Sequence, residues 1–415
     1  MRNSHTLLRC ALLGSAIAVI ALTPAAGAKT LPDNVKRDLA VHGKHALAHR
    51  LNSPASQRGG VGPTYTLLHT FAGGTTDGED PSANVTLDAE GNIYGNTGFG
   101  GAHGDGTIFK LTPGGSLTLL HSFSGSDGQD PDGGLLLTPT GKMYGTTSGG
   151  GSGSNGVLFR LSAKGKYKKL HDFSLDDGSL VRGDLIRDKD GNLYGTALFG
   201  GANDDGTVFK YGADGTFTVL HAFNGGDGEF VEHGVVKDKD GNLYGVTAFG
   251  GDDDEGTVFK LAPNGTLTTL HSFTGNADGG FLYGGLDIDS DGNVYGSTED
   301  GGANGEGTVF KIAPNGDLTT LYNFTGGTDG GSPASDMTLV GGNLYGIAED
   351  GGDPTCQCGV IYKVTMGGQE SVLHTFTGTD GGGYSEGVVA YKKKLYGTSG
   401  DGANGDGVVF SVTKQ

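Results

Sequence analysis

The chain has 415 residues, of which 83 are glycine and none is tryptophan. Its formal net charge of −19 disfavours nucleic acid as a partner, because nucleic-acid binding depends on clustered lysine and arginine. The glycines recur in phase along the chain, so they indicate turns rather than a low-complexity segment.

The first 28 residues have the pattern of a secretory signal peptide. A basic start with two arginines precedes an apolar run over residues 10–22, and small residues follow at Ala26 and Ala28. The run is too short for a membrane-spanning helix, and no other long one follows. We therefore expect an extracytoplasmic protein, secreted or periplasmic, with no membrane span in the mature chain. Loss of the two arginines leaves 26 basic against 47 acidic residues, a formal charge of −21.

Residues 29–63 differ in composition from the rest of the chain. They are basic, contain His42, His45 and His49, and end in SPASQRGGVGP. This composition indicates a flexible leader into the following domain. The histidines fit a solvated segment better than a metal site.

From residue 64 onwards one sequence unit is repeated. Its Tyr-Gly pair begins at Tyr94, Tyr144, Tyr194, Tyr244, Tyr295, Tyr345 and Tyr396. The spacings are 50, 50, 50, 51, 50 and 51 residues. A period of this length with several short strands per unit is typical of a β-propeller.

Each unit contains four candidate strands, written in one copy as GVVKD, NLYGVT, GTVFKL and LTTLHSF. The repeat region begins with YTLLHTF, the last strand of a unit, and ends with GVVFSV, the third. We therefore predict an all-β fold, a seven-bladed β-propeller over residues 64–415. It is closed by pairing of the N-terminal strand with the C-terminal blade. An open solenoid is the alternative.

The repeated pattern LHxF, DG, GNLYGTT, GG and GTVFKL resembles the GloVer tandem repeats of exported proteins. The resemblance covers residues 64–415 in seven linked copies. It implies no established reaction, and members of the family differ in their C-terminal anchoring tails. This chain stops at Gln415, five residues past Phe410, without an apolar tail, so we do not expect C-terminal anchoring.

Residues that recur in every copy are explained first by blade structure. A ring with a single functional site needs one set of functional residues, not seven. The repeated Asp-Gly pair predicts a turn in which the aspartate bonds nearby backbone. It begins at Asp77, Asp127, Asp177, Asp227, Asp278, Asp329 and Asp380. The histidine of LHxF is expected to form a hydrogen bond between strands of its own blade.

Positions at which the seven copies differ are the candidates for function. Those near the start of each innermost strand are Asp132, Arg182, Asp184, Glu232, His233, Tyr283, Asp336 and Glu386. Propeller loops converge at one end of the central channel, so these residues predict a mixed ring at a channel mouth. Such a ring could bind a polar ligand or hold a general acid and base. A hydrated channel mouth with no assigned task is the alternative.

A calcium loop is a separate hypothesis. The stretch DIDSDGN places Asp287, Asp289 and Asp291 at alternate positions before a glycine, a spacing used to turn oxygen ligands toward Ca²⁺. A hairpin turn explains the same residues, and Thr298 stands where a glutamate would complete an EF-hand-like set. Calcium is thus a cofactor to consider, and no cofactor is certain.

Cys356 and Cys358 are the cysteines that follow the predicted signal peptide. In an oxidising compartment they predict a local disulfide, with two free thiols as the alternative.

Three functions compete at this level. The leading hypothesis is an exported, monomeric, non-catalytic propeller that binds a protein or glycan at the cell envelope or outside the cell. The second is an extracellular enzyme acting on a polysaccharide or lactone, with Asp132, Glu232 or His233 as acid and base. The third is a structural surface protein that associates with itself.

Overall fold

The computed structural model describes residues 63–81 and 83–414. The predicted signal peptide, and the predicted leader up to residue 62, lie outside the described residues. The described residues form 30 β-strands and no helix, so none of them offers a helix that could cross a membrane.

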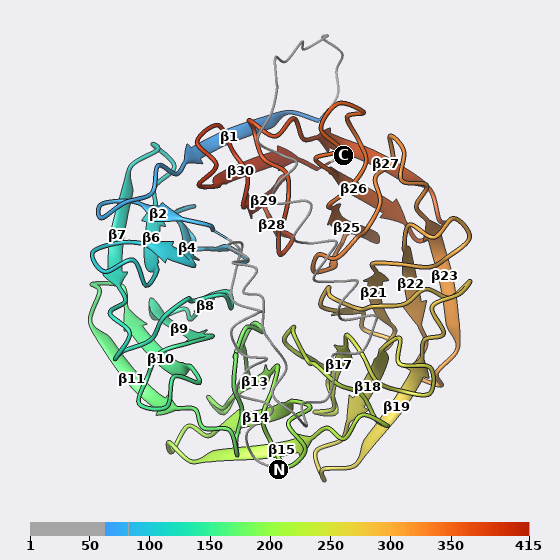
Figure 1. Cartoon of the computed structure of the whole chain (residues 1–415), viewed down its shortest axis with the longest axis horizontal. Helices are drawn as coiled ribbons and strands as arrows, with labels where there is room; N and C mark the ends of the chain where they lie inside the picture. Colours follow the sequence, from blue (N-terminus) through green and yellow to red (C-terminus); the bar gives the residue numbers. More distant parts are fainter. Residues whose placement is uncertain (1–62, 82, 415) are drawn as a thin grey trace, which may run out of the picture. The chain divides into compact units, whose positions relative to one another are not determined.

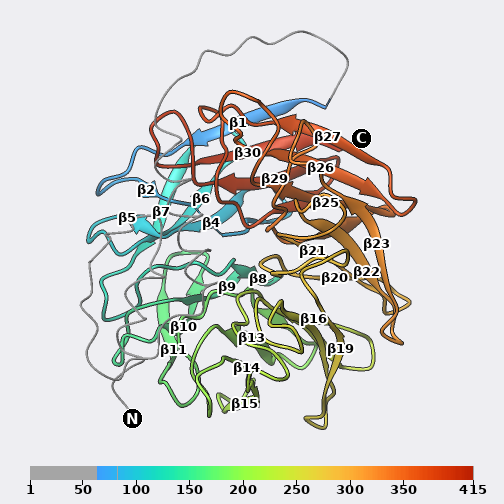
Figure 2. The same ribbon diagram turned by 45° about the vertical axis from the view of Figure 1, so that its right-hand side comes forward.

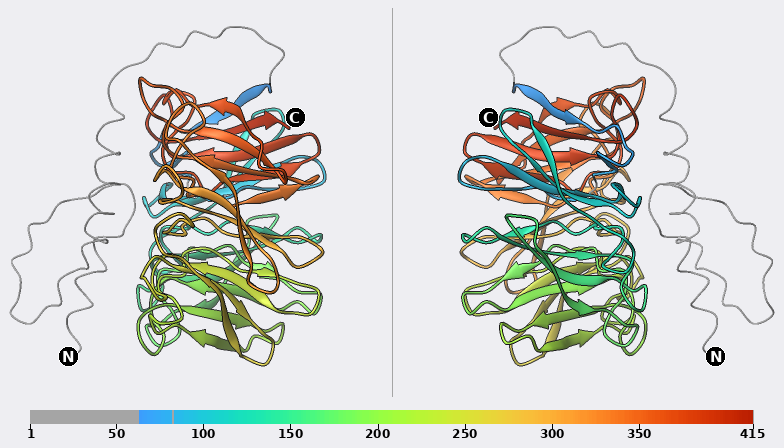
Figure 3. Two further views of the ribbon diagram at one scale, coloured as in Figure 1. Left: turned by 90° about the vertical axis from the view of Figure 1, so that its right-hand side faces the viewer. Right: turned by 90° about the vertical axis from the view of Figure 1, so that its left-hand side faces the viewer.

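Seven antiparallel sheets of four strands follow one another along the chain and form the blades of a propeller (Figure 1). Edge-on views show the blade strands running between the two faces of the ring (Figure 3). The innermost strands of blades one to seven are β3 (Thr86–Leu87), β8 (Leu136–Leu137), β12 (Ile186–Arg187), β16 (Val236–Lys237), β20 (Asp287–Ile288), β24 (Thr338–Val340) and β28 (Val388–Tyr391). The second strands are β4 (Ile93–Thr97), β9 (Lys142–Thr147), β13 (Leu193–Ala197), β17 (Leu243–Thr247), β21 (Val294–Thr298), β25 (Asn343–Ala348) and β29 (Lys394–Ser399).

The two outer strands of each blade have five or six residues, and a register shift interrupts the pairing between them. The third strands are β6 (Thr107–Leu111), β10 (Val157–Ser162), β14 (Thr207–Tyr211), β18 (Thr257–Leu261), β22 (Thr308–Ile312), β26 (Val360–Thr365) and β30 (Val408–Thr413). The outermost strands are β7 (Leu117–Ser122), β11 (Tyr167–Asp172), β15 (Phe217–Ala222), β19 (Leu267–Ser272), β23 (Leu318–Asn323), β27 (Glu370–Thr375) and, for blade seven, β1 (Tyr65–Thr70). A short additional ladder joins β2 (Gly78–Glu79) to β5 (Phe99–Gly100).

The two ends of the repeat region close the ring. Strand β1 pairs antiparallel with β30, from Tyr65 opposite Val412 to Thr70 opposite Val408. In the turned view of Figure 2 these two strands lie side by side at the top of the ring. The seven-bladed propeller and its closure by the N-terminal strand are therefore confirmed, and the solenoid alternative is wrong.

The repeated Tyr-Gly and LHxF motifs build the core between blades. In blade four a Cβ on Gly245 would lie 2.6 Å from Cζ of Phe259, so only glycine leaves room for this ring. Phe259 is fully buried and packs edge to face on Phe223 of blade three, with ring centroids 5.2 Å apart. The phenylalanine of each LHxF motif thus belongs to one blade and fixes the next.

The repeated aspartate holds the turn that leads into the next blade. In one copy Asp227 Oδ1 accepts a hydrogen bond from the backbone N–H of Asn224 at 3.0 Å. Its Oδ2 lies 2.9 Å from Nε2 of His221. The predicted turn is therefore present, but the side-chain hydrogen bond of the histidine is to this aspartate rather than to another strand of its blade.

Candidate functional site

The predicted channel-mouth residues lie in the connections between the outermost strand of one blade and the innermost strand of the next. Arg182 precedes β12, and Glu232 precedes β16. A backbone bridge between Glu229 and Phe249 joins this connection to the one between β17 and β18. Both kinds of connection therefore lie at the same end of the ring, and we call this end the channel mouth.

Arg182 bridges three blades at the channel mouth. Its Nε lies 3.2 Å from Oδ2 of Asp132, and its Nη1 lies 4.0 Å from Oε1 of Glu232. Burial disfavours the charged guanidinium, but Asp132 and Glu232 outweigh burial and raise the pKa of Arg182 above its ordinary value. Arg182 is thus a fixed cation between two carboxylates.

Four further predicted residues, Asp184, His233, Asp336 and Glu386, meet Asn84 in what we call the axial cluster. Nδ1 of His233 lies 2.9 Å from Oδ1 of Asp336 and 3.3 Å from Oε2 of Glu386. The side-chain amide of Asn84 donates to Oδ2 of Asp336 at 2.6 Å and to Oδ2 of Asp184 at 3.3 Å. These contacts join blades one, three, four, six and seven, so the side chains meet near the axis of the ring.

Backbone groups also hold the carboxylates of the axial cluster. The N–H of Gly134 donates to Oδ1 of Asp184, and the N–H of Gly285 donates to Oδ1 of Asp336, each at 2.6 Å. The hydroxyl of Tyr384 donates to Oε1 of Glu386. Asp184 and Asp336 are therefore oriented by backbone groups of neighbouring blades, and Glu386 by a tyrosine of its own connection.

The axial cluster contains more carboxyl groups than its single imidazole can neutralise. Burial, reinforced by Asp336, raises the pKa of Asp184 to about 6. Burial also raises the pKa of Glu386 to about 8, although His233 opposes this. Burial disfavours the imidazolium of His233, but Glu386 and Asp336 outweigh burial and raise its pKa to about 10. The raised pKa values of Asp184 and Glu386 therefore reflect burial of several carboxyl groups close together.

Asp130 and Asp132 form a pair of carboxyl groups beside Arg182. Asp130 is only 4% exposed and accepts a hydrogen bond from the hydroxyl of Ser148 at 2.9 Å. Burial, and then the charge of Asp132, raise the pKa of Asp130 well above its usual range. Burial beside a second carboxyl group therefore favours the protonated form of Asp130 over the ionised one.

The remaining predicted residue, Tyr283, belongs to a group of aromatic side chains that we call the aromatic arc. Phe230 contacts Phe199 and Phe249, with ring centroids 4.9 and 5.4 Å apart. Phe249 also contacts Phe281 and Tyr283, at 5.3 and 6.2 Å. Phe230, Phe281 and Tyr283 are half-buried.

In the structure, the side chains of Asp287 and Asp289 accept hydrogen bonds from different protein N–H groups. Asp287 accepts hydrogen bonds from the N–H groups of Leu339 and Ile288. Asp289 accepts from the backbone and side-chain amides of Asn293 within its hairpin. Asp291 donates its own N–H to Asp289. The hairpin-turn explanation accounts for these contacts, and among the described residues a converging group of metal donors forms instead at His233, Asp336 and Glu386.

Cys356 and Cys358 form a disulfide in the structure. They lie in the connection between β25 and β26, away from the residues of the axial cluster in the sequence. The disulfide closes its own loop, and Cys358 is buried in the core between blades six and seven.

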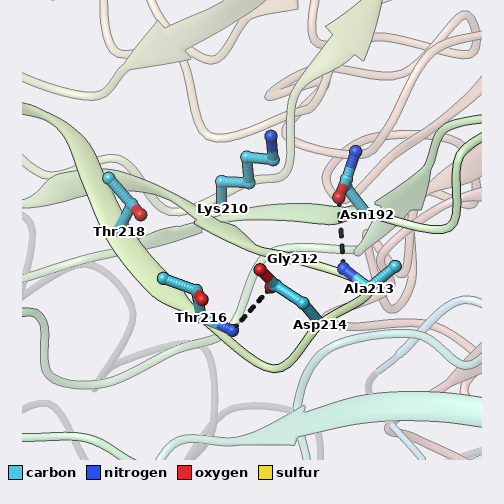
Figure 4. Close-up of a pocket in the computed structure, with 7 residues that line it drawn as sticks. All are labelled: Asn192, Lys210, Gly212, Ala213, Asp214, Thr216 and Thr218. Carbon is cyan, nitrogen blue, oxygen red and sulfur yellow. Dashed lines mark hydrogen bonds between the residues drawn. The ribbon is translucent and has the colours of Figure 1, made fainter.

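A surface pocket of about 390 Å³ lies elsewhere, at the hairpin between β14 and β15 (Figure 4). Its lining consists of Asn192, Lys210, Gly212, Ala213, Asp214, Thr216 and Thr218. Asn192 accepts a hydrogen bond from the N–H of Ala213, and Asp214 accepts one from the N–H of Thr216. The first contact joins the β12–β13 turn to the β14–β15 hairpin, and the second lies within that hairpin, so both are turn contacts of blade three.

The fold and these side chains define a repeat β-propeller with charged and aromatic residues gathered at one end of its ring. The Gloeobacter/Verrucomicrobia repeat matches residues 57–238 and 231–415. The chain therefore belongs to this repeat family, as the sequence resemblance indicated. No curated protein matches the sequence.

Solved structures share the fold at low sequence identity. The extracellular domain of a protein described as a one component system from B. thetaiotaomicron is 12% identical, with a TM-score of 0.54 over 86% of this chain and 40% of that one. A second such domain, described as from a hybrid two component system of B. thetaiotaomicron, is 13% identical, with a TM-score of 0.55 over 81% and 38%. A mutant of puromycin hydrolase complexed with PGG is 12% identical, with a TM-score of 0.52 over 76% and 49%. These likenesses show the fold alone, and the chain spans about two fifths of the first two proteins.

Proposed function

We propose that this propeller is an exported, non-catalytic module that binds a glycan at its channel mouth. The observation that carries the proposal is the aromatic arc beside the charged residues. In a single connection, the half-buried ring of Phe230 is followed by Glu232 and His233. A sugar presents an apolar face and a hydroxyl edge, which suit an aromatic ring and a carboxylate respectively.

The character of the remaining surface favours a glycan over a protein partner. The large apolar side chains that are exposed among the described residues are Leu67, Leu175, Met366 and Tyr384. They belong to four separate segments of the chain, whereas a contiguous apolar patch marks a protein interface. The channel mouth itself carries ion pairs at its centre, whereas the core of a protein interface is depleted of charge.

Export is part of the proposal and rests on the first 28 residues. Their basic start, apolar run and terminal alanines have the pattern of a cleaved signal peptide. The proposed setting is therefore the cell envelope or the medium, where polysaccharides are available as ligands.

The test is a binding screen of the mature chain, residues 29–415, against polysaccharides and oligosaccharides, followed by calorimetry on the tightest ligand. The variant carrying Phe281→Ala and Tyr283→Ala should bind at least about tenfold more weakly, a loss of about 1.4 kcal/mol. The control is Tyr391→Ala, which removes a tyrosine ring from the β28–β29 hairpin at the other end of the ring. Equal affinity in all three proteins, or binding of no glycan, would contradict the proposal.

One observation favours a second candidate, a hydrolase for a polysaccharide or lactone. Asp130, whose pKa burial and Asp132 raise, and Asp132, which pairs with Arg182, would serve as acid and base at the channel mouth. This candidate predicts turnover in a panel of polysaccharides and lactones, abolished by Asp132→Asn. Absence of turnover in the wild-type chain would eliminate it.

A further inference from the structure

The axial cluster has the donor set and the spacing of a metal centre. We propose that His233, Asp336 and Glu386 bind one divalent transition-metal ion, of which Mn²⁺ and Zn²⁺ suit the ligands best. This inference concerns the metal alone, so it stands whether or not the channel mouth binds a glycan.

The distances between donor atoms match those of ligands around one ion. Nδ1 of His233, one oxygen of Asp336 and one oxygen of Glu386 all lie within 4.8 Å of one another. The imidazole nitrogen is 2.9 Å from Asp336 Oδ1 and 3.3 Å from Glu386 Oε2. Metal–ligand bonds of about 2.0–2.2 Å place neighbouring ligands roughly 2.8–3.6 Å apart. Both separations therefore fit adjacent coordination positions.

Blade structure does not require these side chains. The positions equivalent to His233 in blades three and five are Gly183 and Gly284, and both blades form the same four-stranded sheet. The position equivalent to Asp336 in blade four is Gly234. The three donors are thus additions to a scaffold that folds with glycine at the same places.

The surroundings of the donors hold them in place. Asn84 donates to the second oxygen of Asp336 at 2.6 Å, and Tyr384 donates to the second oxygen of Glu386. The backbone N–H of Asp336 donates to the carbonyl of Glu386 at 2.6 Å, so these two segments are joined directly. Such outer hydrogen bonds orient metal ligands and raise the affinity of a site.

The excess of carboxyl groups over imidazole in the axial cluster also favours binding of a cation. Asp184, Asp336 and Glu386 bring three carboxyl groups to one imidazole, and the side chains of His233 and Glu386 are only 8% and 12% exposed. Buried carboxylates without a matching positive charge are costly. One divalent ion bound to neutral His233 would supply that charge.

The mixed donor set selects among metals. Imidazole nitrogen suits Zn²⁺ and other late transition metals, while carboxylate oxygen suits Mn²⁺, Mg²⁺ and Ca²⁺. One nitrogen with two carboxylate oxygens therefore favours Mn²⁺ or Zn²⁺, because Ca²⁺ takes sites made of oxygen.

The experiment is metal binding by the mature chain after chelator treatment and dialysis. Calorimetry with Mn²⁺, Zn²⁺ or Ca²⁺ alone should give one equivalent of Mn²⁺ or Zn²⁺ with a dissociation constant of about 10 μM or tighter. The thermal midpoint should rise with the same metal, because a ligand that binds the native state stabilises it. Glu386→Gln keeps the side-chain volume and should weaken binding at least tenfold. The matched control His221→Gln alters a repeated His–Asp pair outside the cluster and should bind as the wild type does.

Asp336→Asn gives a second measurement at an independent ligand and should also weaken binding at least tenfold. Folding of each variant is checked by its far-UV circular dichroism spectrum. The proposal is overturned by the absence of a stoichiometric Mn²⁺ or Zn²⁺ site in the folded chain, by a site that binds only Ca²⁺, or by equal affinity in Glu386→Gln, Asp336→Asn and the wild type.

Discussion

Glu370 provides a quantitative test of how the outer strands are packed. It begins β27 opposite Val364, at a position where the other blades carry leucine, phenylalanine or tyrosine. Burial, reinforced by Asp329, raises the pKa of Glu370 to about 7. An unfolded glutamate has a pKa of about 4.3, so the native state favours the protonated carboxyl. The contribution of Glu370 to the free energy of unfolding is therefore fully present below the unfolded pKa. It is lost as the pH rises through about 7, because the unfolded chain ionises first.

The size of the effect follows from the two pKa values. A rise from about 4.3 to about 7 corresponds to at most about 4 kcal/mol, and solvent access to the half-buried carboxyl reduces this to about 1–2 kcal/mol. Glu370→Gln should therefore unfold in urea like the wild type at pH 4.5 and be about 1–2 kcal/mol more stable than it at pH 8.5. Glu90→Gln in the β3–β4 hairpin controls for loss of an exposed carboxyl. The same stability difference at both pH values would refute the reasoning.

Two further predictions concern the scaffold. Gly245→Ala should lower the free energy of unfolding by about 1–3 kcal/mol, because its Cβ would lie 2.6 Å from Phe259. Gly114→Ala, where the nearest atom is 3.8 Å away, should stay within about 0.5 kcal/mol in the same urea titration, and a larger loss there would undermine the comparison. A chain that begins at residue 71 lacks β1 and leaves β30 as an open edge, so it should unfold at lower urea and self-associate in size-exclusion chromatography. A monomer with an unchanged urea midpoint would show that closure by β1 contributes little.

The fold could be predicted because each weak strand signal occurs seven times. The period near 50 residues and the partial units at both ends were sufficient for the blade count and for the pairing of β1 with β30. Contacts between copies were harder to predict. The contact of Phe223 with Phe259 crosses a blade boundary, and a repeat pattern does not distinguish contacts within a copy from contacts between copies.

The site could be predicted in part. Comparing the copies brought out Arg182 and His233, and the structure places both at the channel mouth in ion pairs with other predicted residues. It did not bring out Asn84, which stands at the position of Asp184 and Asp336 in its own copy and contacts both of them. These contacts depend on the diameter of the ring and on the length of the side chains, and the repeat period predicts neither.

The aromatic arc was missed although its signal was present. Phe230 and Phe281 stand two residues before Glu232 and Tyr283, where copies one and two carry Asp80 and Asp130. Aromatic side chains thus replace acidic ones at a position just before the predicted ring, and this difference between the copies is visible in the sequence.

The most direct measurement of the central claim is hydrogen–deuterium exchange of the mature chain with and without the polysaccharide that it binds most tightly. Glycan binding at the channel mouth predicts slower exchange in residues 224–235 and 274–286, the connections that carry Phe230, Glu232 and Tyr283. Slower exchange confined to the hairpins at the other end of the ring, or no change in any connection, would contradict it.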